Sequence, residues 1–215
     1  MRTFNLLVAV FALLQIVRYA RRALLFLAPR VRVTGEADGE PRSAGLLRAE
    51  AELERLGFSR LGVLHERTAL GAHARLALTY ASLGRAAFAD AFEERGAPSP
   101  RVRFVTPFGD GAAVLTAGFE RPAAQSAKLF ASGLAEASLE ELLRAHELAV
   151  RRFSSAHGPP EVTLELAARL EAARAYCDGE GRRELGHGQG LAFGLAVFGF
   201  VLFASALRIL LARTP

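Results

Sequence analysis

Residues 188–207 read GQGLAFGLAVFGFVLFASAL, and this stretch decides the architecture of the chain. None of its residues is charged, and an α-helix of this length covers about 30 Å, the thickness of the hydrocarbon core of a bilayer. The segment is apolar on all sides and lies between Arg182 and Arg208. We therefore predict a transmembrane helix and not the core helix of a soluble domain.

A second apolar segment lies near the N-terminus. Residues 4–17 carry no charge, but as a helix they cover only about 21 Å, which is short for a span. Three interpretations compete: a cleaved signal peptide, an interfacial amphipathic helix and a membrane span. The first is disfavoured because Arg2 is the only early charge and no cleavage site of small residues follows the run. We prefer a span over residues 3–20, with the arginines after Val17 at the membrane interface.

Charged residues are distributed unevenly along the chain. The net charge is +5 and the pI is about 10.3, yet all 22 Asp and Glu residues lie between Glu36 and Glu184. Residues 33–186 hold 19 of the 27 Lys and Arg residues against these 22 acids, a balance of −3. The other basic residues flank the apolar ends: Arg2, Arg18, Arg21, Arg22, Arg30, Arg32, Arg208 and Arg213. This distribution indicates anionic lipid head groups as partners and argues against nucleic acid binding.

The orientation follows from the same arginines. Eight arginines flank the apolar segments on the side of the central region, against three on the other side. By the positive-inside rule, this predicts a two-helix hairpin in the inner (plasma) membrane of a bacterium, with a cytoplasmic central domain and both termini outside. One lysine against 26 arginines indicates a GC-rich bacterial genome. Cys177 is the only cysteine, so no intrachain disulfide can form.

The central region, residues 33–186, predicts a water-facing domain between the membrane segments 1–32 and 187–215. Residues 33–42 are rich in Gly, Glu and Asp and predict a linker. Five β-like runs separated by turn residues predict an antiparallel meander: residues 59–65, 73–81, 86–92, 101–108 and 112–119. Gly109-Asp110-Gly111 is a tight hairpin connection between the last two.

Three helices are predicted around this meander. Residues 43–56 place leucines on one side of the first helix. Ser138 and Glu141 form a capping box that opens the second helix, over residues 139–153. Residues 161–177 carry an apolar seam at helical spacing. We therefore expect an α+β fold, with an antiparallel β-meander and helices packed on one face, flanked by an N-terminal and a C-terminal transmembrane helix.

Three stretches of the central region carry a resemblance to known proteins. They are Leu56-Gly-Phe-Ser-Arg-Leu-Gly62, Phe104-Val-Thr-Pro-Phe-Gly-Asp-Gly-Ala-Ala-Val-Leu-Thr116 and Ser138-Leu-Glu-Glu-Leu-Leu-Arg-Ala-His146. Together they resemble uncharacterised bacterial membrane-anchored proteins with a central α+β domain. The resemblance rests on short motifs and covers about half of the chain. It implies the architecture and brings no known activity.

Four residues are candidates for a binding site. His65 and His73 flank a loop and Asp110 lies at a hairpin tip, although solvated loop histidines and a turn aspartate are the more common interpretation. His146 lies on the apolar face of its helix, so we expect it to be buried and hydrogen-bonded to the backbone. No histidine pair has a metal-ligand spacing and no HExxH or CxxC motif occurs, so no metal or other cofactor is predicted.

These features favour a non-catalytic function, because no catalytic nucleophile and base are recognisable in the sequence. We predict a membrane-tethered domain that binds a protein partner or belongs to a membrane complex. The alternative is a small-molecule-responsive or lipid-responsive sensor domain, and the third possibility is a membrane-bound enzyme of unrecognised type. Gly190 and Gly194 form a GxxxG pair, which permits close helix approach and a homo-oligomer through the membrane helices.

Overall fold

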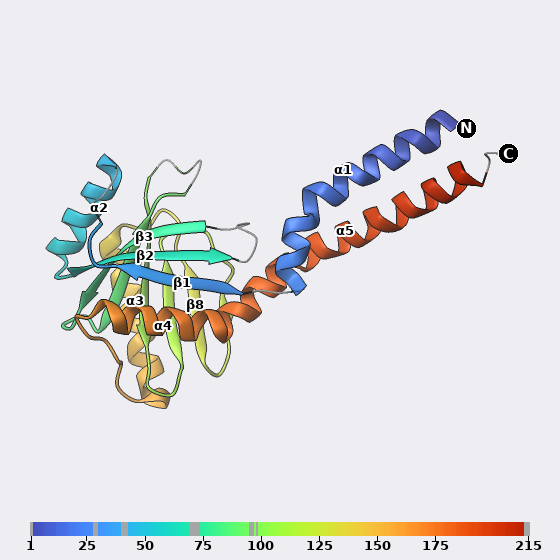
Figure 1. The fold of residues 1–215 in the computed structure, drawn as a ribbon. Helices are drawn as coiled ribbons and strands as arrows, with labels where there is room; N and C mark the ends of the chain where they lie inside the picture. The colour runs from blue at the N-terminus through green and yellow to red at the C-terminus, as the bar shows by residue number, and fades with distance from the viewer. Residues whose placement is uncertain are drawn as a thin grey trace. The chain divides into compact units, whose positions relative to one another are not determined.

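The structure is a computed structural model that describes residues 2–27, 30–39, 43–68, 74–94, 97 and 99–212. The elements along the chain are α1 (Arg2–Leu27), β1 (Val31–Glu36), α2 (Ala44–Arg55), β2 (Ser59–Thr68), β3 (Ala74–Ser82), β4 (Ala87–Phe92), β5 (Arg101–Pro107), β6 (Ala113–Ala117), β7 (Ala124–Gln125), β8 (Leu129–Gly133), α3 (Leu139–His157), α4 (Leu166–Asp178) and α5 (Glu180–Leu211) (Figure 1). They form two compact units. One contains α1 and nearly all of α5, and the other contains the sheet with α2, α3 and α4.

The strands form one sheet in the order β1-β2-β3-β4-β5-β6-β8-β7. From β2 to β6, each strand pairs antiparallel with the next, for example with Val63 opposite Leu78 and Phe88 opposite Val105. β8 instead runs parallel to β6. The predicted α+β class is confirmed, and so is the antiparallel meander through β6. The parallel strand beyond it was not predicted.

Two predicted segments differ from the structure. Residues 33–42 were predicted to be a linker, but most of β1 lies there and forms the edge of the sheet. The helix predicted over residues 161–177 begins only at Leu166. The residues before it are held to the sheet instead, because Glu161 N donates a hydrogen bond to Pro107 O at 2.9 Å and Pro160 forms a β-bridge.

Helices cover both faces of the sheet, so the prediction that they pack on one face is wrong. On the first face, here called the α3 face, one core cluster joins Leu53 of α2 and Leu142 of α3 to the strands. On the opposite face, here called the α4 face, Arg169 of α4 binds Asp90 of β4. Figure 1 shows α3 and α4 on opposite sides of the strands.

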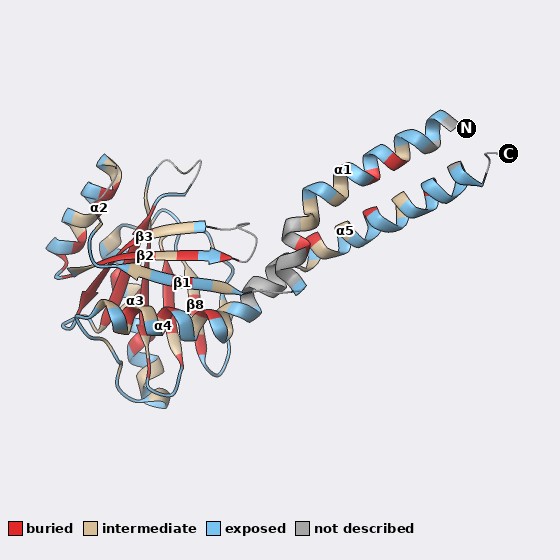
Figure 2. Cartoon of the chain, viewed as in Figure 1, coloured by how far each residue is buried: buried red, intermediate tan, exposed pale blue. Residues whose placement is uncertain are grey.

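The composition of β4 explains why both faces need a cover. All six of its residues, AFADAF, are buried, and Figure 2 shows in red that much of the middle of the sheet is buried. Its three alanines belong to the core cluster under α2 and α3. Phe88, Asp90 and Phe92 alternate with them and therefore point to the α4 face. A central strand buried on both sides requires a layer on each side, and α4 supplies the second.

The helical unit contains one helix, Gly190–Ile209 within α5, that is long and apolar enough to cross a membrane by its length and composition. Large apolar side chains are exposed along it: Leu191, Val197, Phe198, Phe200, Val201 and Ile209. The apolar stretch of α1, Leu6–Ala20, is shorter. Its large apolar side chains are exposed as well, among them Phe11 and Leu14.

α1 and α5 approach one another closely at Gly199. A Cβ atom at this position would lie 3.2 Å from Ile16 Cγ1 and 3.3 Å from Ala12 O. Gly194, in contrast, has no neighbour that a Cβ atom would meet within 4 Å. The close approach between these two helices therefore uses Gly199, and not Gly194 of the GxxxG pair.

Candidate functional site

His146 on α3 is fully buried, and both of its ring nitrogens have hydroxyl partners. Nε2 lies 2.9 Å from Thr106 Oγ1 and Nδ1 lies 3.0 Å from Thr116 Oγ1. The Thr106 hydroxyl donates its single hydrogen to Ala86 O, at 2.7 Å. His146 Nε2–H must therefore donate to Thr106, and Nδ1 must accept from the Thr116 hydroxyl. This chain of hydrogen bonds fixes the tautomer and joins α3 to β5, β6 and the β3–β4 turn.

The environment of His146 is that of a core residue. Its predicted burial is confirmed, but the predicted backbone partner is wrong, since both partners are threonine side chains. Burial lowers the pKa of His146 to about 3, so the imidazole is neutral at physiological pH. A general base must reach a proton of its substrate. His146 is 0% exposed and packs against the ring of Phe104, so its nitrogens cannot reach a substrate.

The structure does not bring His65 and Asp110 together. His65 lies on β2, with Nε2 3.9 Å from Glu36 Oε1. Through the strand register it sits at the end of the sheet where β5 begins, whereas Asp110 follows the end of β5. The third candidate, His73, lies outside the described residues. Among the residues that are described, no three His, Cys, Asp or Glu side chains converge as metal ligands.

Asp110 has a different partner, His157, at the C-terminal end of α3. Asp110 Oδ2 lies 2.9 Å from His157 Nδ1, and Oδ1 accepts a hydrogen bond from Ala112 N at 3.0 Å. These two contacts, the first more strongly, lower the pKa of Asp110. The His157 ring also stacks on Phe153, with centroids 4.3 Å apart. The pair fastens the hairpin tip to α3, and no sequence motif marks His157 as the partner of Asp110.

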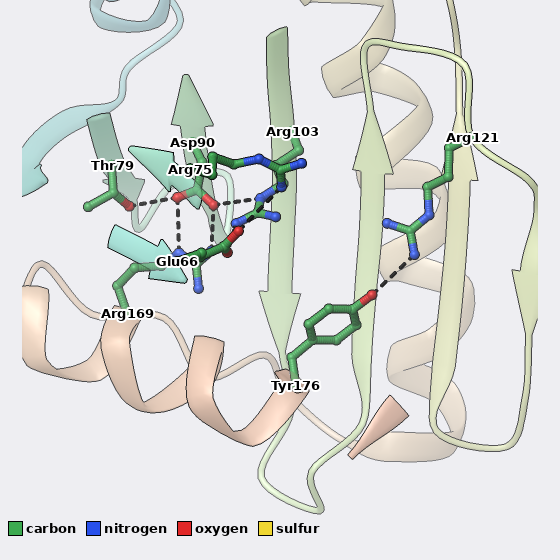
Figure 3. A network of polar contacts seen from close by, with 8 residues as sticks. All are labelled: Glu66, Arg75, Thr79, Asp90, Arg103, Arg121, Arg169 and Tyr176. Carbon is green, nitrogen blue, oxygen red and sulfur yellow. Dashed lines mark hydrogen bonds and ion pairs between the residues drawn. The ribbon is translucent and has the colours of Figure 1, made fainter. Parts of the chain in front are cut away.

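A buried ion network on the α4 face is centred on Asp90, which is 0% exposed (Figure 3). Asp90 Oδ1 accepts hydrogen bonds from Thr79 Oγ1 at 2.8 Å and from Arg169 Nε at 3.2 Å. Asp90 Oδ2 accepts from Arg103 Nε at 2.8 Å and from Arg169 Nη2 at 2.5 Å. One carboxylate of β4 thus joins β3, β5 and α4.

Glu66 of β2 extends the network. Arg103 also donates to Glu66 Oε1, and Arg75 of β3 donates to Glu66 Oε2 at 3.3 Å. Burial alone would raise the pKa of both carboxyls, but nearby arginines outweigh it, so that both pKa values are lowered. For Asp90 the stronger contribution comes from Arg169 and for Glu66 it comes from Arg103. The oxygens of both carboxylates are thus occupied by arginine and threonine donors, which ties these carboxylates to the structure of the sheet.

A hollow of about 490 Å³ opens where β3 turns into β4. It is lined by Arg55, Leu56, Gly57, Ser59, Ala81, Ser82, Leu83, Gly84, Arg85 and Leu164. Leu83 is 58% exposed and Leu164 is 51% exposed, so both side chains are available for apolar contacts with another molecule. Arg85 pairs with Glu147 at 3.0 Å, while Arg55 has no ion-pair partner in the described part of the chain. The lining contains no His, Cys, Asp or Glu and therefore no side chain suited to general acid or base catalysis at neutral pH.

Comparisons with known proteins identify no family. The chain matches no protein-family model, and no curated protein and no solved structure is significantly similar to it. The resemblance to bacterial membrane-anchored proteins gains no support from these comparisons. Inferences about function therefore rest on the geometry of the site itself.

Proposed function

We propose that this protein is a membrane-tethered, non-catalytic domain that binds a protein partner through the hollow at the β3–β4 turn. The lining of the hollow carries the proposal, because Leu83 and Leu164 are exposed beside Arg55 and Arg85 without an acid–base group. Leucines next to arginines suit a partner segment with apolar and acidic side chains. The hollow is open to solvent, whereas a small-molecule sensor would need an enclosed apolar pocket.

Membrane tethering is the second part of the proposal. Residues 1–32 and 187–215 form two spans, and residues 33–186 form a cytoplasmic domain at the inner membrane of a bacterium. Gly190–Ile209 supports the second span through its length and composition. The contact of Ala12 and Ile16 with Gly199 supports a paired first span, whose arginines reach the interface. Anionic head groups are the charge partners of these arginines, and nucleic acid is not a ligand of the domain.

The topology is expected to appear in thiol labelling of a Gly84→Cys variant in a Cys177→Ala background. Gly84 has open space around it, so the new thiol is accessible without a clash. An impermeant maleimide should leave it unlabelled in intact cells and should label it in sealed inverted membrane vesicles, and the labelled protein should stay with the membranes in a later alkaline carbonate wash. A matched Thr3→Cys variant should show the reverse pattern. Labelling of Gly84→Cys in intact cells contradicts the orientation, and recovery of the protein in the carbonate supernatant contradicts membrane insertion.

The partner site is tested by a photo-crosslinking amino acid at Leu83 in the full-length protein in its native membranes. We expect a discrete adduct whose yield falls about tenfold in an Arg55→Glu variant, because the reversed charge repels an acidic partner. The matched control places the same group at Leu148, which is 47% exposed on α3 outside the hollow. The same adducts from both positions, or no effect of Arg55→Glu, would reject the hollow as the docking site.

A further inference from the structure

We infer that α4 is a detachable helix, which separates from the sheet as a unit while the sheet stays folded, and which lies in the chain between a residue of the hollow and α5. By sequence, α4 ends at Asp178 and α5 begins at Glu180. At its other end, Leu164 of the hollow lies two residues before the start of α4. The role of the hollow as a partner site rests on the proposed function, but the separation of α4 does not.

The apolar contact of α4 with the sheet is small. Its fully buried residues are Arg169, Ala173 and Cys177, none of which is a large aliphatic side chain. Leu170 and Tyr176 are only partly buried, Leu170 next to Gly35 of β1 and Tyr176 against the cluster around Leu115. α3 in comparison buries Leu142, Leu143, His146, Ala149 and Val150. Because hydrophobic stabilisation scales with buried apolar area, α4 gains much less from docking than α3 does. The attachment of α4 therefore depends in large part on polar contacts: those of Arg169 with Asp90, and the weaker ones of Arg174 with Val33 O at 3.3 Å and of Tyr176 Oη with Arg121 at 3.1 Å.

The charges of the ion network are balanced even without α4. The four members on the strands, Glu66, Arg75, Asp90 and Arg103, carry two negative and two positive charges. Arg169 adds a third positive charge to this balanced set. After α4 separates, Asp90 still has Arg103, so no carboxylate is left buried without a cation. The usual penalty for breaking a buried ion pair, an uncompensated buried charge, does not arise in this case.

Docking also leaves Arg169 incompletely satisfied. Its Nη1 atom is buried and has no hydrogen-bond partner, although the residue is only 2% exposed. A buried donor without a partner costs free energy relative to the same donor in water. Separation of α4 would hydrate Nη1 along with the rest of the guanidinium group. Figure 3 shows Arg169 reaching from α4 toward the strand residues of the network.

Both ends of α4 are suited to a hinge. Its N-cap, Glu165, makes no side-chain capping hydrogen bond, so no cap stabilises the first turn of the helix. The preceding chain is fixed to the sheet at Glu161, which leaves residues 162–165 as the connection between this point and α4. At the other end, Gly179 separates α4 from α5. Movement can thus be confined to α4 and its two short connections.

Cys177 reports separation directly, because it is the only thiol and is buried on α4. In the full-length protein in detergent, we expect the protection factors of Cys177 alkylation and of amide exchange across α4, each relative to the unfolded chain, to be at least about tenfold smaller than those of amide exchange in β3, β4 and β5. Arg169→Ala should accelerate Cys177 alkylation about tenfold further without changing exchange in these strands. The matched control is Arg144→Ala, which removes an exposed arginine of α3 and should change neither rate.

A protection factor of Cys177 in the wild type as large as those of the amides in β3–β5 would overturn the inference. The wild-type comparison decides even if Arg169→Ala does not fold. The readouts do not involve a partner, so this outcome is distinct from that of the Leu83 crosslinking. A failed crosslink with rapid Cys177 alkylation would reject the partner site and leave the detachable helix.

Discussion

Replacement of Asp90 by asparagine is expected to lower the free energy of unfolding of the sheet unit by about 3–5 kcal/mol. The substitution preserves the shape of the side chain but removes the charge shared by Arg103 and Arg169, at 2.8 and 2.5 Å. The side chain of Arg103 is 9% exposed and that of Arg169 is 2% exposed, so water cannot replace the carboxylate while the fold is intact. Amide hydrogen exchange of β4 and β5 in the full-length protein in detergent measures the change.

The control for this prediction is Arg75→Gln, which removes one charge from the same network. The side chain of Arg75 is 19% exposed, contacts Glu66 at 3.3 Å and lies over the Phe92 ring, 4.2 Å from its centroid. Glu66 keeps Arg103 as a partner when Arg75 is replaced, and no buried carboxylate is left without a cation, so we expect a smaller loss, of about 1–2 kcal/mol. Equal effects of Asp90→Asn and Arg75→Gln would show that burial does not set the strength of these contacts.

The meander could be predicted from the sequence because its signals are local. Alternation in residues 73–81 and the Gly109-Asp110-Gly111 turn specify strands and a hairpin without reference to the rest of the chain. β1 and β8 lack such signals. β1 contains Gly35 and charged residues, and β8 is five residues long and pairs parallel with β6 through a non-local connection. Non-local pairing leaves no pattern within a short window.

The ion network had a signal that the sequence analysis did not use. Asp90 is the only charged residue in the strand AFADAF, and a lone carboxylate in an apolar strand must be paired if the strand is buried. Arg103 lies directly opposite Asp90 in the register of β4 and β5, so an alignment of these strands would have suggested that pair. Arg169 comes from α4, and no local rule predicts on which face of the sheet a helix will pack.

For the candidate binding residues, too, local properties could be predicted from the sequence and contacts with distant segments could not. Burial of His146 followed from its helical face, which is a local property. Its partners, Thr106 and Thr116, lie on two other elements and could be assigned only after the strands were placed. The hollow combines the end of α2, the β3–β4 turn and Leu164, none of which carries a motif. A site made of ordinary surface residues from distant segments is visible only in the folded chain.

The free energy of unfolding of the wild-type protein is expected to fall by about 2 kcal/mol between pH 7 and pH 5, because of the titration of His146. Burial lowers its pKa from the ordinary 6.5 to about 3. The unfolded chain therefore takes up a proton near pH 6.5 that the folded chain does not bind until about pH 3. Stabilisation is full above pH 6.5 and is lost as the pH falls through this window. Glu66 and Asp90, whose pKa values are also lowered, contribute to the loss only near and below their ordinary values of 4.5 and 3.8.

A His146→Leu variant separates this titration from packing, because leucine keeps most of the volume and binds no proton. Its unfolding free energy, measured by hydrogen exchange at pH 5 and pH 7, should lack the loss of about 2 kcal/mol. At pH 7 the variant should lose about 1–3 kcal/mol, because the Thr116 hydroxyl loses its acceptor while Thr106 keeps Ala86 O.

Two further variants distinguish the packing of His146 from its hydrogen bonds. His146→Ala also opens a cavity and should cost about 2–4 kcal/mol at pH 7. Adding Thr116→Val to His146→Leu removes the orphaned hydroxyl and should restore most of the loss, since both partners of the hydrogen bond are then apolar. If the pH dependence persists in His146→Leu, another histidine is responsible for it. If His146→Leu and His146→Ala are both as stable as the wild type at pH 7, the histidine does not stabilise the fold. A ligand should then be sought in the core around Thr106 and Thr116.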